Sequence, residues 1–302
     1  MGKRWVASVV LAIVALIGVS ACGSSSPEAN SVSRTTTASS PTTTPSRGGN
    51  TGRRPSTTTT TPGGSIEGTE INQLPQVPSG PPASPDMPST GQALNTFLTG
   101  TFNDIQNMWS EEFKKAGVTY VPATLRIFTG SVQTACGAQG SETGPFYCPG
   151  DRTVYLDTSF FALMEQQFGV TGDFAPAYVV AHEMGHHVQA LLGISTQVAQ
   201  ADQVDPAGTN GRSVRVELQA DCLAGVWAHS TEQRGLLKDG QMAEALKAAA
   251  AVGDDFIAKA AGQPTEPDNF THGTSEQRQR WLTTGFEKGI PDACDTFSPA
   301  TV

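Results

Sequence analysis

The chain has 302 residues and a formal net charge of −9, with only 16% of its residues charged. Its length suffices for a linker and one domain with a sizeable core, or for two small domains. Lysine and arginine form no cluster that would bind phosphate, so the sequence argues against a nucleic-acid partner.

The N-terminus has the pattern of an export signal. Two basic residues at positions 3 and 4 precede the almost wholly apolar residues 5–19, and Cys22 follows two small residues. A basic start, a short apolar run and small residues before a cleavage point are typical of a secretory signal peptide. The cysteine at this point resembles the lipobox of bacterial lipoproteins. We therefore expect a signal peptide over residues 1–21 and lipidation of Cys22. The alternative is an uncleaved anchor, for which the apolar run is short. Either reading places the rest of the chain on the extracytoplasmic face of the cell membrane.

The segment after Cys22 has the composition of a disordered tether. Residues 23–90 contain no aromatic residue, and 46 of these 68 residues are Ser, Thr, Pro or Gly. Such a segment buries too little apolar surface to offset the entropy of ordering. We expect a Ser/Thr/Pro/Gly-rich tether over residues 22–90 and one domain over residues 91–302.

Apolar spacing predicts the elements of this domain in chain order. The expected strands are residues 124–128, 146–148 and 153–156, the last two joined by a turn at Pro149-Gly150-Asp151. The expected helices are residues 94–113, 160–168, 176–192, 213–229 and 242–257, followed by one that begins at Thr274 with a capping box to Gln277. The fold class is therefore α+β, mainly helical, with a small sheet.

Four cysteines remain besides Cys22, namely Cys136, Cys148, Cys222 and Cys294. Four cysteines allow three connectivities, and an exported compartment favours oxidation. We favour Cys136–Cys148, which closes a short local loop, together with Cys222–Cys294. Free buried thiols are the alternative.

The motif His182-Glu183-Met184-Gly185-His186 lies within the predicted helix 176–192. The two histidines are four residues apart, so a helix projects both from one face, where they can bind one ion. Glu183 points about 100° away around the helix and can act on a water at an open metal position. An ordinary helix with surface histidines is the alternative, but the residues around the motif are apolar.

A third metal ligand is expected from the predicted helix 213–229, because a catalytic zinc has three protein ligands and one open position. Glu217 and Asp221 lie four residues apart among apolar and small residues. We expect Glu217 to bind the metal and Asp221 to accept the free ring N–H of a metal-binding histidine, which orients the ring. A solvated helix face is the alternative.

Four blocks of sequence together resemble the bacterial family of neutral zinc metallopeptidases. The blocks are GPFYCP (144–149), HEMGHH (182–187), ELQADCLAGVW (217–227) and THGTSEQR (271–278). The resemblance covers about residues 120–297, and the layout is similar to that of gluzincins. It implies a zincin-like domain, one Zn²⁺ per chain and hydrolysis of peptide bonds in a peptide or protein substrate.

In the mechanism that this implies, Glu183 activates a zinc-bound water. The oxyanion of the transition state needs a further donor. His272 is the candidate, and a surface or capping role is the alternative. Tyr147 and Tyr155 are alternatives that are more typical of packing residues, and His187 points away from the ligand face.

Two features leave alternatives open. The sheet around residues 146–157 is expected beside the metal-binding helix, where an exposed edge could pair with an extended peptide. Arg278 and Arg280 could pair with Asp254 or Asp255, or with a substrate carboxylate.

The competing functions are a non-catalytic zinc-containing cell-envelope binding module and a zinc hydrolase of non-peptide amides.

Overall fold

The structure is a computed structural model, and it describes residues 91–302. The expected signal peptide (1–21), the lipidation site Cys22 and the expected tether (22–90) lie outside the described residues. Within residues 91–302, no helix combines the length and the apolarity needed to cross a membrane.

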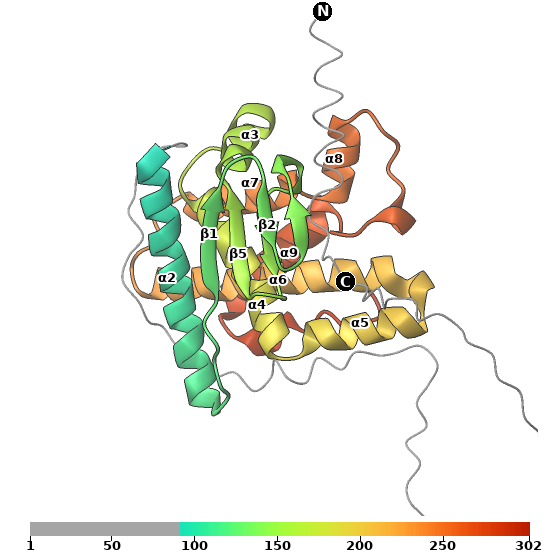
Figure 1. The fold of residues 1–302 in the computed structure, drawn as a ribbon, viewed down its shortest axis with the longest axis horizontal. Helices are drawn as coiled ribbons and strands as arrows, with labels where there is room; N and C mark the ends of the chain where they lie inside the picture. The colour runs from blue at the N-terminus through green and yellow to red at the C-terminus, as the bar shows by residue number, and fades with distance from the viewer. Residues whose placement is uncertain (1–90) are drawn as a thin grey trace, which may run out of the picture.

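The fold is α+β and mainly helical, as the sequence predicted, and Figure 1 shows how the elements are arranged. The helices are α2 (Gly91–Ala116), α3 (Thr158–Phe168), α4 (Phe174–Leu191), α5 (Ile194–Val204), α6 (Thr209–Gln233), α7 (Gln241–Ala251), α8 (Asp254–Ala260) and α9 (Ser275–Lys288). The strands are β1 (Thr124–Phe128), β2 (Val132–Thr134), β3 (Gly137–Gln139), β4 (Phe146–Cys148) and β5 (Thr153–Asp157). A short 3-10 helix, η5 (Pro291–Cys294), lies near the C-terminus.

The main sheet has three strands in the order β1-β5-β4. Strand β5 is central and all five of its residues are buried. It pairs in parallel with β1 and antiparallel with β4, so that Val154 lies opposite both Leu125 and Tyr147. Strands β2 and β3 form a separate antiparallel pair. The Cys136–Cys148 disulfide ties this pair to β4.

Helix α4 runs through the core of the molecule. All of residues 174–189 are buried, as expected for a helix that is covered on every side. It contacts α2, α6 and α7 as well as β4 and β5. Gly185 allows a close approach to α6, because a Cβ atom there would lie 3.0 Å from the Cα of Ala220.

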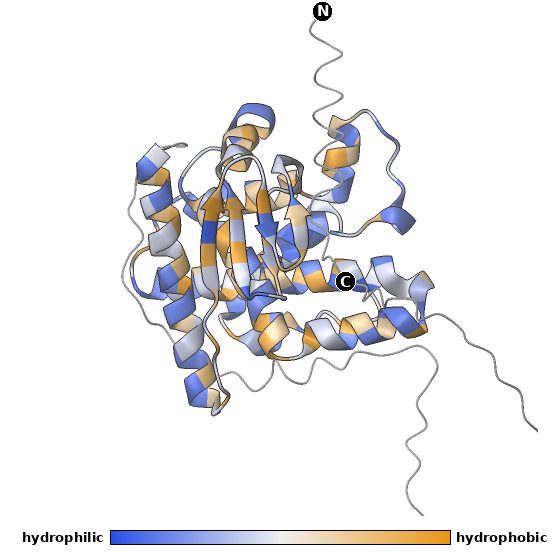
Figure 2. Ribbon diagram, in the orientation of Figure 1, coloured by the Kyte–Doolittle hydropathy of each residue, from blue (hydrophilic) through white to orange (hydrophobic). Residues whose placement is uncertain are grey.

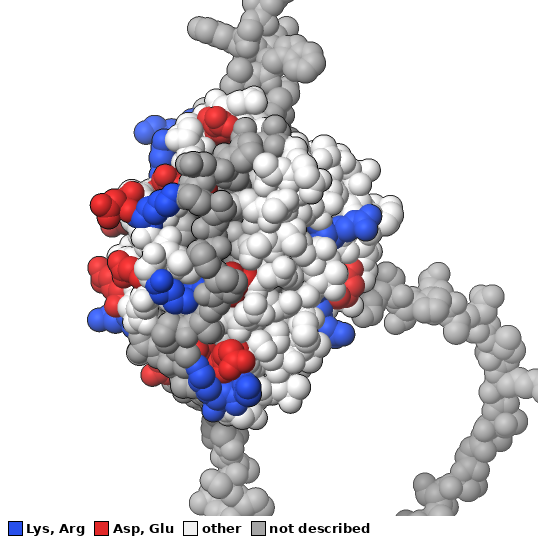
Figure 3. Space-filling model, turned by 90° about the vertical axis from the view of Figure 1, so that its left-hand side faces the viewer, with Lys and Arg blue, Asp and Glu red and all other residues white. Residues whose placement is uncertain are grey.

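Helix α2 covers another part of the core. Its hydrophilic and hydrophobic residues alternate along the ribbon in Figure 2, as expected for an amphipathic helix. Asp104 on this helix accepts hydrogen bonds from Trp227 Nε1 at 2.9 Å and, in bidentate fashion, from Arg234. These contacts join α2 to the end of α6. On the face that Figure 3 shows, basic and acidic side chains lie intermixed.

Helix α6 is fixed to the C-terminal part of the chain. The Cys222–Cys294 disulfide joins it to η5, and both predicted disulfide pairings are therefore confirmed. Gly225 and Gly285 let α6 and α9 cross at close range, since a Cβ atom on Gly285 would lie only 1.9 Å from the Cys222 carbonyl oxygen.

The prediction of one helix over residues 242–257 is wrong. The chain instead breaks between α7 and α8 at Val252 and Gly253. The first residue of α9 packs against this break, because a Cβ atom on Gly253 would lie 2.4 Å from the Ser275 nitrogen. Helix α5 and the β2–β3 pair were not predicted.

Candidate metal centre

The centre begins with helix α4, which places His182, Glu183 and His186 in the core. Their exposed fractions are 4%, 2% and 8%. The two imidazole rings meet edge to face, with centroids 4.8 Å apart, because residues four apart share one face of a helix. The sequence prediction of a helical motif with both rings on one side is therefore confirmed.

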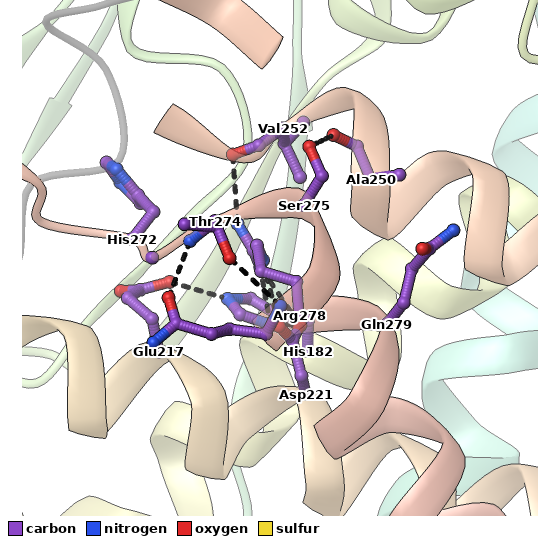
Figure 4. A network of polar contacts seen from close by, with 12 residues as sticks. His182, Glu217, Asp221, Ala250, Val252, His272, Thr274, Ser275, Arg278 and Gln279 are labelled. Carbon is purple, nitrogen blue, oxygen red and sulfur yellow. Dashed lines mark hydrogen bonds and ion pairs between the residues drawn. The ribbon is translucent and has the colours of Figure 1, made fainter. Parts of the chain in front are cut away.

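Glu217 on α6 faces both histidines. Its Oε2 atom lies 3.1 Å from His182 Nε2, and its Oε1 atom lies 3.5 Å from His186 Nε2. One ligand atom from each of the three side chains falls within a group whose members all lie within 4.8 Å of one another. Figure 4 shows Glu217 directed at the His182 ring.

These residues fit a zinc ion. Two imidazoles and one carboxylate form a ligand set that catalytic zinc sites use, with a position left for water. Glu217 is completely buried, and its Oε1 atom has no hydrogen-bond partner. A buried carboxylate oxygen without a donor is costly, and a cation between Glu217 and the two rings would remove that cost.

The Nδ1 side of His182 is bound by charged and polar groups. Asp221 Oδ1 lies 2.8 Å from His182 Nδ1. The same carboxylate accepts two hydrogen bonds from Arg278, at 2.8 and 2.9 Å, and one from the Tyr178 hydroxyl at 2.6 Å. Asp221 therefore holds the ring with Nε2 facing Glu217, as predicted, while Arg278 balances the buried charge (Figure 4).

Arg278 was one of two arginines whose partner the sequence left open. The structure pairs it with Asp221 rather than with Asp254 or Asp255. Asp254 instead accepts hydrogen bonds from the backbone nitrogens of residues 271, 272 and 273, at 2.9, 2.7 and 2.9 Å. This carboxylate organises the segment before α9.

The electrostatics of the centre favour a positive charge between the two carboxylates. Burial alone would lower the pKa of His182, but Asp221 and Glu217 raise it to about 10. Burial would raise the pKa of Glu217, and the two histidines instead hold it far below its usual range. Burial lowers the pKa of His186. A metal ion would take the place of the proton on His182.

Glu183 lies next to the candidate metal ligands and is not one of them. Burial raises its pKa to about 7, against an opposing effect of His182. The backbone N–H of Tyr147 on β4 donates to the carboxylate, while the Oε2 atom has no hydrogen-bond partner. The carboxylate thus combines a near-neutral pKa with one oxygen ready to accept a proton.

His272 lies in the segment before α9, with 6% of its surface exposed. Its Nδ1 atom lies 3.0 Å from Asp254 Oδ1. Burial would lower the pKa of this ring, and Asp254 and Glu217 raise it. The influence of Glu217 places His272 within electrostatic reach of the centre.

The other sequence candidates have structural partners. The Tyr147 hydroxyl lies 3.0 Å from His187 Nδ1, and His187 Nε2 lies 2.9 Å from the Val121 carbonyl oxygen. The Tyr155 hydroxyl donates to Asp151 at 2.9 Å. These contacts join β4 and the segment before β1 to α4, as expected for packing residues.

Two buried glutamines and a tyrosine at the centre were missed. Tyr178 stands four residues before His182, so helical spacing could have indicated it. Gln189 stands three residues after His186, and its Oε1 atom lies 2.9 Å from His186 Nδ1. Gln219 contacts Gln189 from α6 at 3.0 Å, and no local signal marks that pairing.

The comparisons with known proteins agree with this geometry. Residues 66–297 match the family described as "Putative neutral zinc metallopeptidase". A relative from Escherichia coli (strain K12), "Uncharacterized protein YpfJ", is 45% identical over 235 residues, which cover 78% of this chain and 79% of that protein. "Uncharacterized protein Rv2575" from Mycobacterium tuberculosis (strain H37Rv) is 45% identical over 226 residues, covering 70% and 74%. No solved structure matches.

The match covers well over half of the chain, and it includes the two helices that carry His182, His186 and Glu217. The chain belongs to the neutral zinc metallopeptidase family.

Proposed function

We propose that the protein is a zinc-dependent peptidase that hydrolyses peptide bonds outside the cytoplasm. The observation that carries the proposal is the buried group of His182, His186 and Glu217, with the Glu183 carboxylate beside it. The described residues contain one such group, so we propose one Zn²⁺ per chain. The lipobox-like sequence at Cys22 supports a membrane anchor, with the site on the extracytoplasmic face.

Zinc, when bound, supplies a Lewis acid that makes a water more acidic and polarises a carbonyl group. Glu183 accepts the proton of the attacking water and passes it to the leaving amine. Burial raises the pKa of this carboxylate, which favours the return of the proton after Glu183 has accepted it. The water oxygen adds to the carbonyl carbon and gives a tetrahedral oxyanion, and the C–N bond then breaks as Glu183 returns the proton to the amine nitrogen.

Two further elements suit a peptide substrate. His272, held through Nδ1 by Asp254, is our candidate for the donor that stabilises the oxyanion. Strand β4 is an edge strand of the main sheet, and its Tyr147 nitrogen contacts Glu183. An extended peptide that paired with this edge would lie close to the general base.

The test compares the wild-type protein with Glu183→Gln, which preserves the size of the side chain and removes its basicity. Both proteins should contain about one zinc per chain. The wild type should cleave members of a peptide library, and the variant should cleave them roughly 10²- to 10⁴-fold more slowly. Equal cleavage by both would remove Glu183 from the mechanism.

Zinc without peptide cleavage in either protein would favour a non-catalytic binding module, or a hydrolase of non-peptide amides if such amides are cleaved. Cell fractionation tests the proposed membrane anchor. Cys22→Ser should move the protein out of the membrane fraction, and an unchanged distribution would contradict lipidation.

A further inference from the structure

The Nδ1 side of His186 faces two buried glutamines rather than a carboxylate. Gln189 Oε1 lies 2.9 Å from His186 Nδ1. The Gln189 amide nitrogen lies 2.8 Å from the Val216 carbonyl oxygen and 3.0 Å from Gln219 Oε1. The Gln219 amide nitrogen lies 3.0 Å from the Cys294 carbonyl oxygen. Both glutamines are completely buried.

These contacts run in one direction only. A backbone carbonyl oxygen accepts and never donates, so Val216 and Cys294 each require an amide nitrogen to face them. Gln219 then presents its oxygen to Gln189, and Gln189 presents its oxygen to His186. Because that oxygen can only accept, the ring proton of neutral His186 must sit on Nδ1. The lone pair is left on Nε2, the nitrogen that faces Glu217.

We propose that Gln189 and Gln219 are positioning residues of the metal centre, which fix the tautomer and orientation of His186 through this chain of amides. The inference rests on the proposed function to the extent that His186 is a zinc ligand. It assigns the two ligand rings different supports: a buried ion pair holds His182, and a neutral amide chain holds His186.

The end of the amide chain that lies farthest from His186 is fixed by a disulfide bond. Cys294 is bonded to Cys222, which lies on α6 five residues after the ligand Glu217. Val216, the other fixed acceptor, is also on α6. The chain of amides therefore orients the His186 ring relative to α6, the helix that carries Glu217. The His186 ring and the Glu217 carboxylate thus keep their mutual geometry.

Zinc affinity of the whole protein, measured by competition with a chromophoric chelator, tests the inference. Gln189→Met keeps the size of the side chain and removes both hydrogen-bonding groups, and it should weaken zinc binding roughly 10- to 100-fold. Gln219→Met should cause a smaller loss, because it acts one hydrogen bond further away. The matched control is Gln241→Met, a buried glutamine that donates to Asp173 instead, and its affinity should stay within about twofold of wild type.

A second readout needs no variant. In the zinc-free wild type at neutral pH, ¹⁵N NMR of the His186 ring should find the proton on Nδ1 and none on Nε2. A proton on Nε2, or a folded Gln189→Met protein with wild-type zinc affinity, would overturn the inference. Failure of the proposed function looks different: the wild type itself would then bind no zinc, or would bind it and cleave no peptide.

Discussion

Asp221 is a completely buried carboxylate whose surroundings decide whether the centre can form. Burial alone would raise the pKa of this group, and Arg278 and His182 lower it instead. Arg278, itself only 1% exposed, donates to both oxygens of the carboxylate. The ion pair therefore keeps a charged acceptor beside His182 without leaving a buried charge unpaired.

Removal of Arg278 should be costly, because it strands that charge. We expect Arg278→Met to lower the free energy of unfolding of the zinc-free protein by roughly 3–5 kcal/mol. Arg280→Met, at an exposed position of the same helix, should change it by less than about 0.5 kcal/mol. Urea unfolding measures both. The double variant Asp221→Asn/Arg278→Met should recover part of the loss, since no unpaired carboxylate remains. Equal stability of the two single variants would contradict this account.

At the residue scale, the sequence predicted the ligand group because its signals are local. His182 and His186 are four residues apart and therefore share one face of α4. Glu217 and Asp221 are also four residues apart and share one face of α6. The partner of Arg278 was not predictable, because Asp221 lies 57 positions away. Several acidic residues were equally good partners until the crossing of α6 and α9 was known.

At the scale of elements, the crossing of α4 and α6 brings the histidines to Glu217. Gly185 lies between His182 and His186 in the sequence and packs against Ala220. A side chain there would meet the Cα and carbonyl oxygen of Ala220, both 3.0 Å away. These are backbone atoms, so the contact can be relieved only if the helices move apart.

Gly185→Ala should therefore destabilise the protein, even though alanine is the better helix former. We expect a loss of roughly 1–3 kcal/mol from overpacking, together with weaker zinc binding. Gly100→Ala is the matched control on α2, where nothing lies within 4 Å of the added Cβ atom, and it should stabilise by roughly 0.5–1 kcal/mol. Thermal unfolding compares the two. Stabilisation by both substitutions would show that the helices do not meet as described.

The elements that sequence reasoning missed have different physical causes. Strands β2 and β3 have three residues each and no buried face, so no alternating pattern marks them. The break between α7 and α8 follows an alanine-rich segment and falls at Val252 and Gly253, where the low helical propensity of glycine was a local signal for it. The N-terminal end of α9 packs closely at this break, because a Cβ atom on Gly253 would lie 2.4 Å from the Ser275 nitrogen. Long amphipathic helices and the β4–β5 turn were predictable because their patterns are local.

At the scale of the whole molecule, one buried acid outside the centre makes stability depend on pH. Glu112 on α2 is 2% exposed, and neither carboxylate oxygen has a hydrogen-bond partner. Burial raises its pKa from 4.5 to about 7, against the effect of Lys115, whose Nζ atom lies 3.7 Å away. The unfolded chain thus releases this proton at lower pH than the folded protein does.

The sign of the effect follows from linkage. Below pH 4.5 both states keep the proton, and Glu112 costs nothing through ionisation. As the pH rises from 4.5 through about 7, the unfolded state is favoured increasingly. Glu112→Gln should therefore raise the free energy of unfolding by roughly 1–3 kcal/mol at pH 8 and by much less at pH 4.5. The control is Glu111→Gln, because the Glu111 side chain is 45% exposed. It should change the free energy of unfolding little at either pH. Chemical unfolding at the two pH values measures the difference, and a gain that is independent of pH would contradict the assignment.

We propose that His182, His186 and Glu217 together hold one zinc ion. Anomalous diffraction at the zinc absorption edge, from crystals of the zinc-loaded protein, tests it most directly. We expect one strong peak within about 2.0–2.2 Å of a nitrogen of each histidine and an oxygen of Glu217. A peak bound to other residues, or no peak at these three side chains, would contradict it.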